Sequence, residues 1–201
     1  MKPRGFTICF LGPDGSGKST IIEGLLKEDL PFAQYNYFHL KPFPQKGSVE
    51  IQVVTDPHKY KPYSLLKSYC KLLFFVYQYN KGWASHILPL KSKSSLVVFD
   101  RYYDDILVDN KRYRYGGNVS IAKLVRYFIP KPDIYFILTT DANIIHKRKQ
   151  EVSLKELERQ IYDYKSLVDG KRYINIDVSK TPKEIVLEIS SIILSKKDGS
   201  D

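Results

Sequence analysis

A strand, a glycine-rich turn and a helix follow one another at the start of this chain, and they constrain its fold more than any other feature. Residues 6–11 form a short and almost entirely apolar run, which is typical of a strand buried on both faces of a parallel sheet. The turn reads Gly12-Pro-Asp-Gly-Ser-Gly-Lys-Ser-Thr20, and the residues after it place Ile21 and Leu25 on one side of a helix. This order predicts an α/β fold with the turn at the carboxyl edge of a parallel sheet.

The turn has the residue types that hold a phosphate chain. Gly12-x4-Gly17-Lys18-Ser19 is a complete Walker A pattern. Its glycines let successive backbone N–H groups curl around phosphates, and the helix that follows adds a favourable dipole. Lys18 is placed to reach the β- and γ-phosphates, while the Ser19 hydroxyl is a ligand for Mg²⁺. We expect the bound phosphates to be held by the segment that contains Gly12, Asp14, Gly15, Ser16, Gly17, Lys18, Ser19 and Thr20.

Strand and helix patterns alternate along the rest of the chain. Further strands are expected at 34–40, 94–100, 133–138 and 173–178, and helices at 64–88, at 119–129, after Asp141, after Ser153 and from Thr181 to about Lys196. Gly82 marks a point where the helix at 64–88 can break. We predict a three-layer α/β/α architecture of the P-loop NTP hydrolase type with a five-stranded parallel sheet. One domain is expected over 1–196, with a frayed tail at 197–201.

Charge and cysteine content narrow the class of partner. The 201 residues carry a formal net charge of +10, which favours anionic partners such as phosphorylated small molecules, nucleic acid or a membrane surface. The sequence has no long basic tail and no aromatic–basic binding module, so we expect no nucleic-acid partner. Its apolar runs are too short to span a membrane, and Cys9 and Cys70 form no zinc or disulfide pattern. We expect a cytoplasmic protein with reduced thiols.

A pair of charged residues follows the strand at 94–100. Asp100 ends the apolar segment Leu96-Val-Val-Phe99, and Arg101 comes directly after it. Because the carboxyl ends of parallel strands meet at one edge, we expect Asp100 to join Ser19 as a Mg²⁺ ligand. The Arg101 guanidinium suits bidentate binding of a phosphate. We therefore predict catalytic roles for both residues beside Lys18, with a structural ion pair as the alternative.

The chain resembles the thymidylate kinases, which are P-loop nucleoside monophosphate kinases. The resemblance rests on the Walker A segment, on Leu72-Leu-Phe74 and on Asp100-Arg-Tyr102, and the order of elements agrees over nearly the whole chain. The longer segment Asp100-Arg-Tyr-Tyr-Asp-Asp-Ile-Leu-Val-Asp109 is similar to a branch often found with bacterial polysaccharide genes. The resemblance implies ATP and Mg²⁺ at the Walker A segment, a nucleoside monophosphate such as dTMP as acceptor, and usually a homodimer.

The resemblance also implies roles for individual residues. Asp14 approaches the acceptor sugar, and Arg101 binds the acceptor phosphate. Some members carry a catalytic arginine inside the Walker A segment, where this chain has Gly15, and others carry it in the lid. The basic segment Lys147-Arg148-Lys149 falls in the lid region at 146–153. Arg148 is therefore the expected catalytic cation, with its two neighbouring lysines as substitutes.

Departures from the family leave the acceptor open. Phe74 is present for stacking on a base, but Lys41 takes the place of one arginine and Gln78 that of another. Residues 41–62 are rich in proline and are expected to form an irregular loop on the acceptor side. Several carboxylates follow Arg101, and they suit sugar hydroxyls or a second metal unless they form a solvated acidic turn. The expected acceptor contacts are Asp14, Lys41, Phe74, Gln78, Arg101 and Asp105.

The sequence leaves three functions open. The first is an ATP-dependent phosphotransferase of the thymidylate kinase type that acts on a nucleoside monophosphate such as dTMP. The second is a P-loop kinase that acts on a sugar, a sugar phosphate or a glycan, motivated by the carboxylates after Arg101. The third is an ATP-binding protein with a degenerate acceptor site. The intact Walker A segment favours the first two.

Overall fold

Five parallel strands form one sheet in the described part of the chain, in the order β2-β3-β1-β4-β5. The structure is a computed structural model that describes residues 5–44, 60–197 and 199. The strands are β1 (Phe6–Leu11), β2 (Gln34–His39), β3 (Ser95–Asp100), β4 (Ile134–Thr139) and β5 (Tyr173–Asp177). Each strand begins and ends within one residue of its predicted bounds. The predicted five-stranded parallel sheet is therefore confirmed.

Helices connect the strands and cover both faces of the sheet. They are α1 (Lys18–Leu25), α2 (Leu65–Gly82), α3 (Leu88–Ser92), α4 (Asp105–Val108), α5 (Val119–Val125), α6 (Ala142–Arg148), α7 (Leu154–Lys165) and α8 (Pro182–Lys197). A π-helical segment, η1 (Trp83–Ile87), joins α2 to α3, and a 3₁₀ turn, η2 (Arg126–Phe128), extends α5. Gly82 ends α2 where a Cβ would lie 2.5 Å from the carbonyl oxygen of Pro42. The α-helix thus ends at the predicted break point, and the chain continues as the π-helical η1.

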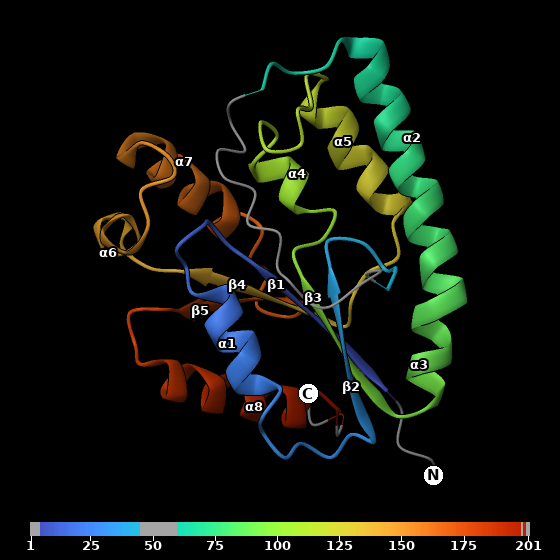
Figure 1. Ribbon diagram of the computed structural model, residues 1–201, viewed down its shortest axis with the longest axis vertical. Helices are drawn as coiled ribbons and strands as arrows, with labels where there is room; N and C mark the ends of the chain where they lie inside the picture. Colours follow the sequence, from blue (N-terminus) through green and yellow to red (C-terminus); the bar gives the residue numbers. More distant parts are fainter. Residues whose placement is uncertain (1–4, 45–59, 198, 200–201) are drawn as a thin grey trace.

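The two faces of the sheet take alternate residues from each strand. Helices α1 and α8 cover one face, and α2, α4, α5 and α7 cover the other (Figure 1). In β1, Ile8 and Phe10 pack toward α1 and α8, whereas Cys9 and Leu11 pack toward the opposite helices. Because both faces are covered, the strand is apolar at every one of these positions. The three-layer α/β/α prediction is confirmed.

The core beneath α2 is rich in tyrosine. Tyr79 and Tyr102 are fully buried and meet edge to face, with ring centroids 4.7 Å apart. The Tyr79 hydroxyl donates to the carbonyl oxygen of Leu40 at 2.5 Å, and the Tyr102 hydroxyl donates to that of Pro130 at 2.8 Å. Burial raises the pKa of both phenols well above the ordinary value. These tyrosines therefore act as core residues that also tie loops to the sheet.

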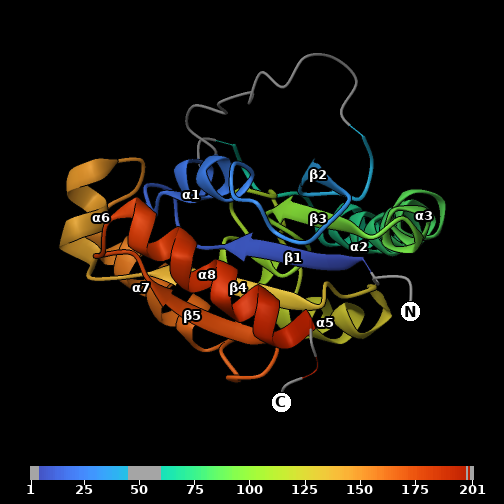
Figure 2. The same cartoon turned by 90° about the horizontal axis from the view of Figure 1, so that it is seen from below.

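The carboxyl ends of the strands meet at one edge of the sheet, and α6 and α7 lie toward the same end of the molecule (Figure 2). Of the predicted loop at 41–62, only residues 41–44 and 60–62 lie within the described part. Helix α8 runs to Lys197, and of the predicted tail beyond it only Gly199 is described. In the described parts of the chain, no helix combines the length and apolar character that a membrane span requires.

Candidate active site

The turn between β1 and α1 has a backbone conformation that only glycine adopts easily. Gly12, Gly15 and Gly17 have φ angles of 149°, 83° and 83°, a region that side chains with a Cβ disfavour. At Gly12 a Cβ would also lie 2.5 Å from the carbonyl oxygen of Leu138 in β4. A turn of this kind before a helix N-terminus presents N–H groups to an anion. The Walker A pattern is thus folded as a turn whose backbone suits the binding of phosphate.

Lys18 lies at the centre of this turn. Its Nζ donates hydrogen bonds to the carbonyl oxygens of Gly12 and Pro13 at 2.8 and 2.9 Å, and its side chain is buried. Burial and then the positive charge of Arg101 lower the pKa of the ammonium to about 8, against the opposing effect of Asp14. A buried cation of this kind gains stability from an added anion, because the anion replaces the water that it has lost.

Asp100 has the geometry of a ligand for a cation beside the turn. Its Oδ2 accepts from the Tyr37 hydroxyl at 3.2 Å and lies 3.5 Å from His39 Nδ1, whereas the buried Oδ1 has no hydrogen-bond partner. Burial raises the pKa of Asp100, but His39 and Lys18 outweigh it and hold the pKa below the usual range. The side chain is therefore an ionised carboxylate with one free oxygen. Ser19 lines the same cavity, and together they fit Mg²⁺.

Arg101 has a strained backbone conformation at the end of β3. Its φ angle of 67° is uncommon for a residue with a side chain, and such conformations persist only where the surroundings hold them. Its N–H donates to the carbonyl oxygen of Phe10 at 2.9 Å. Its guanidinium pairs with Asp14 in the turn and, at 2.6 Å, with Asp105 Oδ2 in α4. The guanidinium is thus held between two carboxylates next to the phosphate-binding turn.

Asp105 is fully buried behind Arg101. Besides Arg101 it accepts hydrogen bonds from the Tyr113 hydroxyl at 2.8 Å and from the Tyr164 hydroxyl. Its neighbour Asp104 points elsewhere, with Arg126 Nε 2.5 Å from its Oδ1. These two carboxylates do not form a solvated acidic turn. Both are buried and paired with an arginine.

The residues around the turn enclose a cavity of about 630 Å³ at the carboxyl edge of the sheet. The predicted site residues that line it are Asp14, Gly15, Gly17, Lys18, Ser19, Thr20, Asp100, Arg101 and Arg148. Gly12 and Ser16 are buried in the turn itself and do not line the cavity. Lys41, Phe74, Gln78 and Asp105 also lie outside its lining. The structure thus gathers the phosphate-binding and catalytic candidates but not most of the acceptor candidates.

The lid region lies directly on the turn. Arg148 ends α6, and its Nη2 donates to the carbonyl oxygen of Val178 at 3.0 Å. Lys149 pairs with Glu151 at 2.6 Å. A Cβ at Gly15 would lie 3.0 Å from the Cβ of Lys149, so the lid segment takes the space that a side chain at position 15 would need. This packing is one reason that position 15 is a glycine.

Side chains from outside the predicted set also line the cavity, namely His39, Leu40, Lys71, Arg112, Tyr113 and Glu151. Lys71 comes from α2, and Arg112 and Tyr113 follow α4. Arg112 pairs with Asp14, so that this carboxylate contacts two arginines. The cluster of basic residues at 111–114 was visible in the sequence, but its approach to the turn depends on how the segment after α4 folds back.

Lys71 is the cation that sequence reasoning missed. Its Nζ donates to the carbonyl oxygen of Tyr113 and lies 5.6 Å from the Phe75 ring centroid. Burial and then the charges of Lys41 and Arg114 lower its pKa to about 8. The sequence did hold a signal for Lys71. This lysine lies four residues before the buried Phe75, so both residues lie on the same side of the helix.

Helix α2 turns Phe75 inward rather than the predicted Phe74. Phe74 is 52% exposed and Phe75 is 4% exposed. The Lys41 ammonium lies over both rings, 5.9 and 5.4 Å from their centroids. Gln78 has a buried Oε1 without a hydrogen-bond partner. The inward face of α2 therefore presents Lys71 and Phe75 toward the cavity side.

Comparisons with known proteins show the family and the fold of this chain. A family model described as thymidylate kinase matches residues 10–189. The solved thymidylate kinase from Candida albicans is 21% identical, covers 96% of this chain and 93% of that chain, and has a TM-score of 0.65. The solved thymidylate kinase from Ehrlichia chaffeensis is also 21% identical, covers 96% of this chain and 100% of that chain, and has a TM-score of 0.60. A family match over this length shows that the chain is an ATP-dependent kinase and belongs to the thymidylate kinase family of P-loop nucleoside monophosphate kinases.

Proposed function

We propose that this kinase transfers the γ-phosphoryl group of ATP to dTMP and uses Mg²⁺. The observation that carries the proposal is that Lys18 of the phosphate-binding turn and the fixed guanidinium of Arg101 line one cavity of about 630 Å³. A cavity of this size suits small ligands. Two phosphate-binding groups side by side suit a reaction that joins two phosphates.

The reaction needs positioning and charge neutralisation rather than a covalent protein intermediate. The turn and Lys18 hold the ATP phosphates, and Arg101 holds the dTMP phosphate. A dTMP phosphate oxygen attacks the γ-phosphorus while the bond to the β–γ bridging oxygen breaks, which yields dTDP and ADP. Arg148 lines the cavity at the end of α6, where it neutralises charge on the transferred group.

Ser19 and Asp100 hold Mg²⁺ in this proposal. The ion neutralises phosphate charge when bound. The unpartnered Oδ1 of Asp100 supports this assignment. Within residues 5–44, 60–197 and 199, no group of three or more His, Cys, Asp or Glu side chains could hold a metal. That finding suits Mg²⁺, which is usually bound by one or two protein groups together with phosphates and water.

The acceptor side of the site combines Asp14, Lys71 and Arg101. Asp14 lines the cavity and its paired arginines fix its carboxylate, so it is available to accept from a sugar hydroxyl. Lys71 supplies a cation from α2 that adds to Arg101 at the acceptor phosphate. We assign this role to Lys71 in place of Lys41, which does not line the cavity. Phe74 and Gln78, the predicted contacts of the base, do not line it either.

A carbohydrate acceptor finds no support in the geometry. Its motivation was the run of carboxylates after Arg101, but Asp104 and Asp105 are buried and each pairs with an arginine. Neither carboxylate lines the cavity. Their role in this proposal is structural, with Asp105 positioning Arg101.

A homodimer and a cytoplasmic location complete the proposal. Helix α2 and the η2 turn leave large apolar side chains exposed, namely Leu66, Leu73, Tyr77, Tyr127 and Phe128. Asn80 Nδ2 donates to the carbonyl oxygen of Phe128 at 2.8 Å, which joins the two elements into one surface. Exposed apolar patches of this kind mark interaction sites. The two free cysteines and the use of ATP are in keeping with the cytoplasm.

Release of ADP from Mg²⁺·ATP, measured with and without dTMP, tests the proposal. We expect turnover that depends on dTMP and is abolished in Lys18→Ala. Lys183→Ala removes an exposed lysine from α8 and should leave turnover unchanged. Turnover that is no greater with dTMP than without it would overturn the acceptor assignment. Turnover retained in Lys18→Ala would overturn the assignment of the turn.

A further inference from the structure

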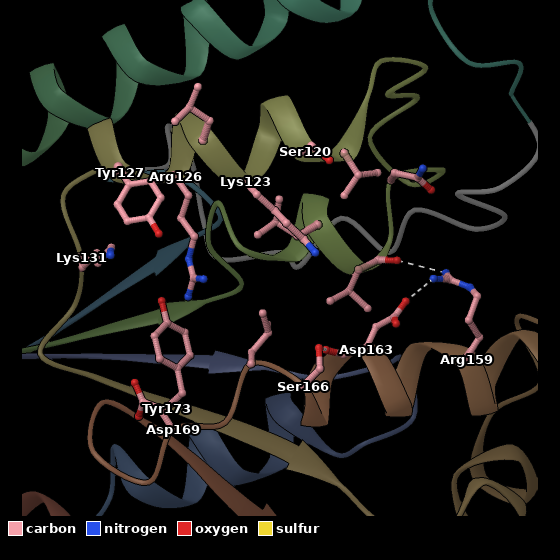
Figure 3. A pocket seen from close by; sticks show the side chains of 16 residues that line it. Ser120, Lys123, Arg126, Tyr127, Lys131, Arg159, Asp163, Ser166, Asp169 and Tyr173 are labelled. Carbon is pink, nitrogen blue, oxygen red and sulfur yellow. Dashed lines mark hydrogen bonds and ion pairs between the residues drawn. The ribbon is translucent and has the colours of Figure 1, made fainter.

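A second cavity, of about 820 Å³, lies between α5 and α7 (Figure 3). Lys131, just before β4, and Tyr173, the first residue of β5, line it, so it opens near the amino ends of these strands. The active site lies at their carboxyl ends. Leu107 and Val108 of α4 separate the two regions, because they line the second cavity while Asp105 holds Arg101 on the other side. The second cavity is therefore distinct from the site described above.

Three cations reach this cavity from one wall. Lys123 and Arg126 come from α5 and η2, and Lys131 follows them. Figure 3 shows the Arg126 guanidinium extending across the cavity toward Tyr173. It lies over the Tyr173 ring, with its Cζ 4.8 Å from the centroid, while its Nε lies 2.5 Å from the buried Asp104. Asp104 therefore pairs with the guanidinium at its Nε, while the rest of the group extends along the cavity toward Tyr173.

The acidic residues on the opposite wall do not neutralise these cations. Asp163 Oδ2 is 2.5 Å from Arg159 Nη1, and Asp169 Oδ1 accepts three backbone N–H groups of its own loop. Among the described residues, no carboxylate lies within ion-pair distance of Lys123 or Lys131. Burial and then the charge of Arg126 lower the pKa of Lys131. The two lysines thus keep unpaired positive charge in the cavity, whereas the charge of Arg126 is paired with Asp104.

We propose that this cavity is a second ligand site, which binds a small molecule carrying phosphate groups. Its volume lies within the range for small-molecule sites, which is about 300–1,000 Å³. A guanidinium held at its base and flanked by two ammonium groups matches several phosphate oxygens better than a single carboxylate. Ser120 and Ser166 also line the cavity and add hydroxyl donors. The ring of Tyr127 covers one side, with Lys131 Nζ 5.4 Å from its centroid.

Pyrophosphate is a suitable probe, and the full chain with Lys18→Ala is a suitable background because it weakens binding at the Walker A turn. Titration followed by amide ¹H–¹⁵N spectra reports where the anion binds. We expect saturable shifts at the amides of Lys123, Tyr127, Ser166 and Tyr173. Lys123→Gln and Lys131→Gln should each weaken binding by about tenfold, the effect of losing one charge-assisted hydrogen bond. Lys183→Gln, on the far face of the sheet, should not change it.

Two results would overturn the proposal. The first is that pyrophosphate at millimolar concentration shifts only amides of the turn, such as Gly15 and Gly17, or none. The second is that Lys123→Gln and Lys131→Gln bind the probe at the cavity as tightly as the background chain. Both lysines have exposed or half-exposed side chains, so neither replacement threatens the fold. Arg126 is not replaced, because its loss would leave the buried Asp104 unpaired.

Discussion

Asp104 and Asp105 are consecutive residues and are equally buried, yet they serve different parts of the molecule. Asp104 pairs with Arg126 beside the second cavity, and Asp105 pairs with Arg101 beside the first. The sequence did not distinguish the two carboxylates, and both suggested binding to sugar hydroxyls or to a second metal. Their directions depend on the way α4 packs into the core, which residue type and spacing do not encode.

We predict that Asp105→Asn lowers kcat with dTMP by about 10- to 100-fold, since a hydrogen bond between charged groups contributes about 1.5–3 kcal/mol. The amide oxygen can still accept from one of the two tyrosine hydroxyls, and the amide NH₂ can donate to the other, so the fold should persist. The KM for ATP should stay unchanged, because Asp105 acts through Arg101 on the acceptor.

Asp104→Asn is the matched control, since it makes the same change at the adjacent buried position. It should lower the midpoint of thermal unfolding and leave the kinetics with dTMP intact. Equal losses of kcat in the two variants would show that Asp105 does not position Arg101.

The pKa of about 8 at Lys71 predicts a pH dependence of acceptor binding. A cation with a lowered pKa is charged below that value and loses its charge as the pH rises through it. The kcat/KM for dTMP should therefore fall above about pH 8 in the wild type. Lys71→Arg keeps its charge, so this part of the decline should disappear. Lys18 has a similar pKa, so kcat/KM for ATP is measured alongside. Identical dTMP profiles in wild type and variant would remove Lys71 from acceptor binding.

At the scale of elements, α6 and the residues after it act as the lid in our proposal. Arg148 lines the cavity, whereas the exposed Lys147 beside it does not. We predict that Arg148→Ala lowers kcat by about 10³-fold or more, as loss of a cation at the transferred phosphoryl group does in related reactions. Lys147→Ala should change kcat little. Single-turnover rates separate this effect from product release, and an unchanged rate in Arg148→Ala would exclude it from the chemistry.

Elements with their own local signal could be predicted from the sequence. The helix expected after Ser153 is α7, and Ser153 Oγ accepts from the Glu156 N–H at 3.3 Å at its start. The strands were equally clear, because burial on both faces requires apolar residues at every position. Helix α4 was missed, since four buried residues show no helical period.

The same contrast holds for the candidate site, where some residues have a signal in the sequence and others are placed only by packing. The placement of Lys18, Asp100 and Arg101 could be predicted because Asp100 ends a parallel strand and the other two lie in segments that follow one, and the topology brings these strand ends together. Phe74 and Phe75 differ by one residue, which is about 100° around a helix, and only packing decides which of them faces inward. Lys71 was missed for the same reason.

At the scale of the whole molecule, the apolar surface on α2 and η2 predicts a dimer. Light scattering should give twice the 23.4 kDa mass of one chain. Leu73 is 69% exposed on this surface, and Leu73→Glu should yield monomers because it places a charge in the interface. Leu187→Glu is the control, since Leu187 is 53% exposed on α8 at the opposite face of the sheet. A wild-type monomer, or a dimer that survives Leu73→Glu, would contradict this interface.

The tyrosine-rich core gives this protein an optical property. Tyrosinate absorbs light at longer wavelength than the neutral phenol, and 16 of the 201 residues are tyrosine. Tyr79, Tyr102 and Tyr135 have pKa values raised well above 10 by burial, so the folded chain keeps them neutral. Their contribution to stability is complete below the ordinary phenol pKa and falls as the pH rises above it. Exposed tyrosines should therefore ionise gradually in alkali, and the buried ones should change absorbance only in the step in which the protein unfolds.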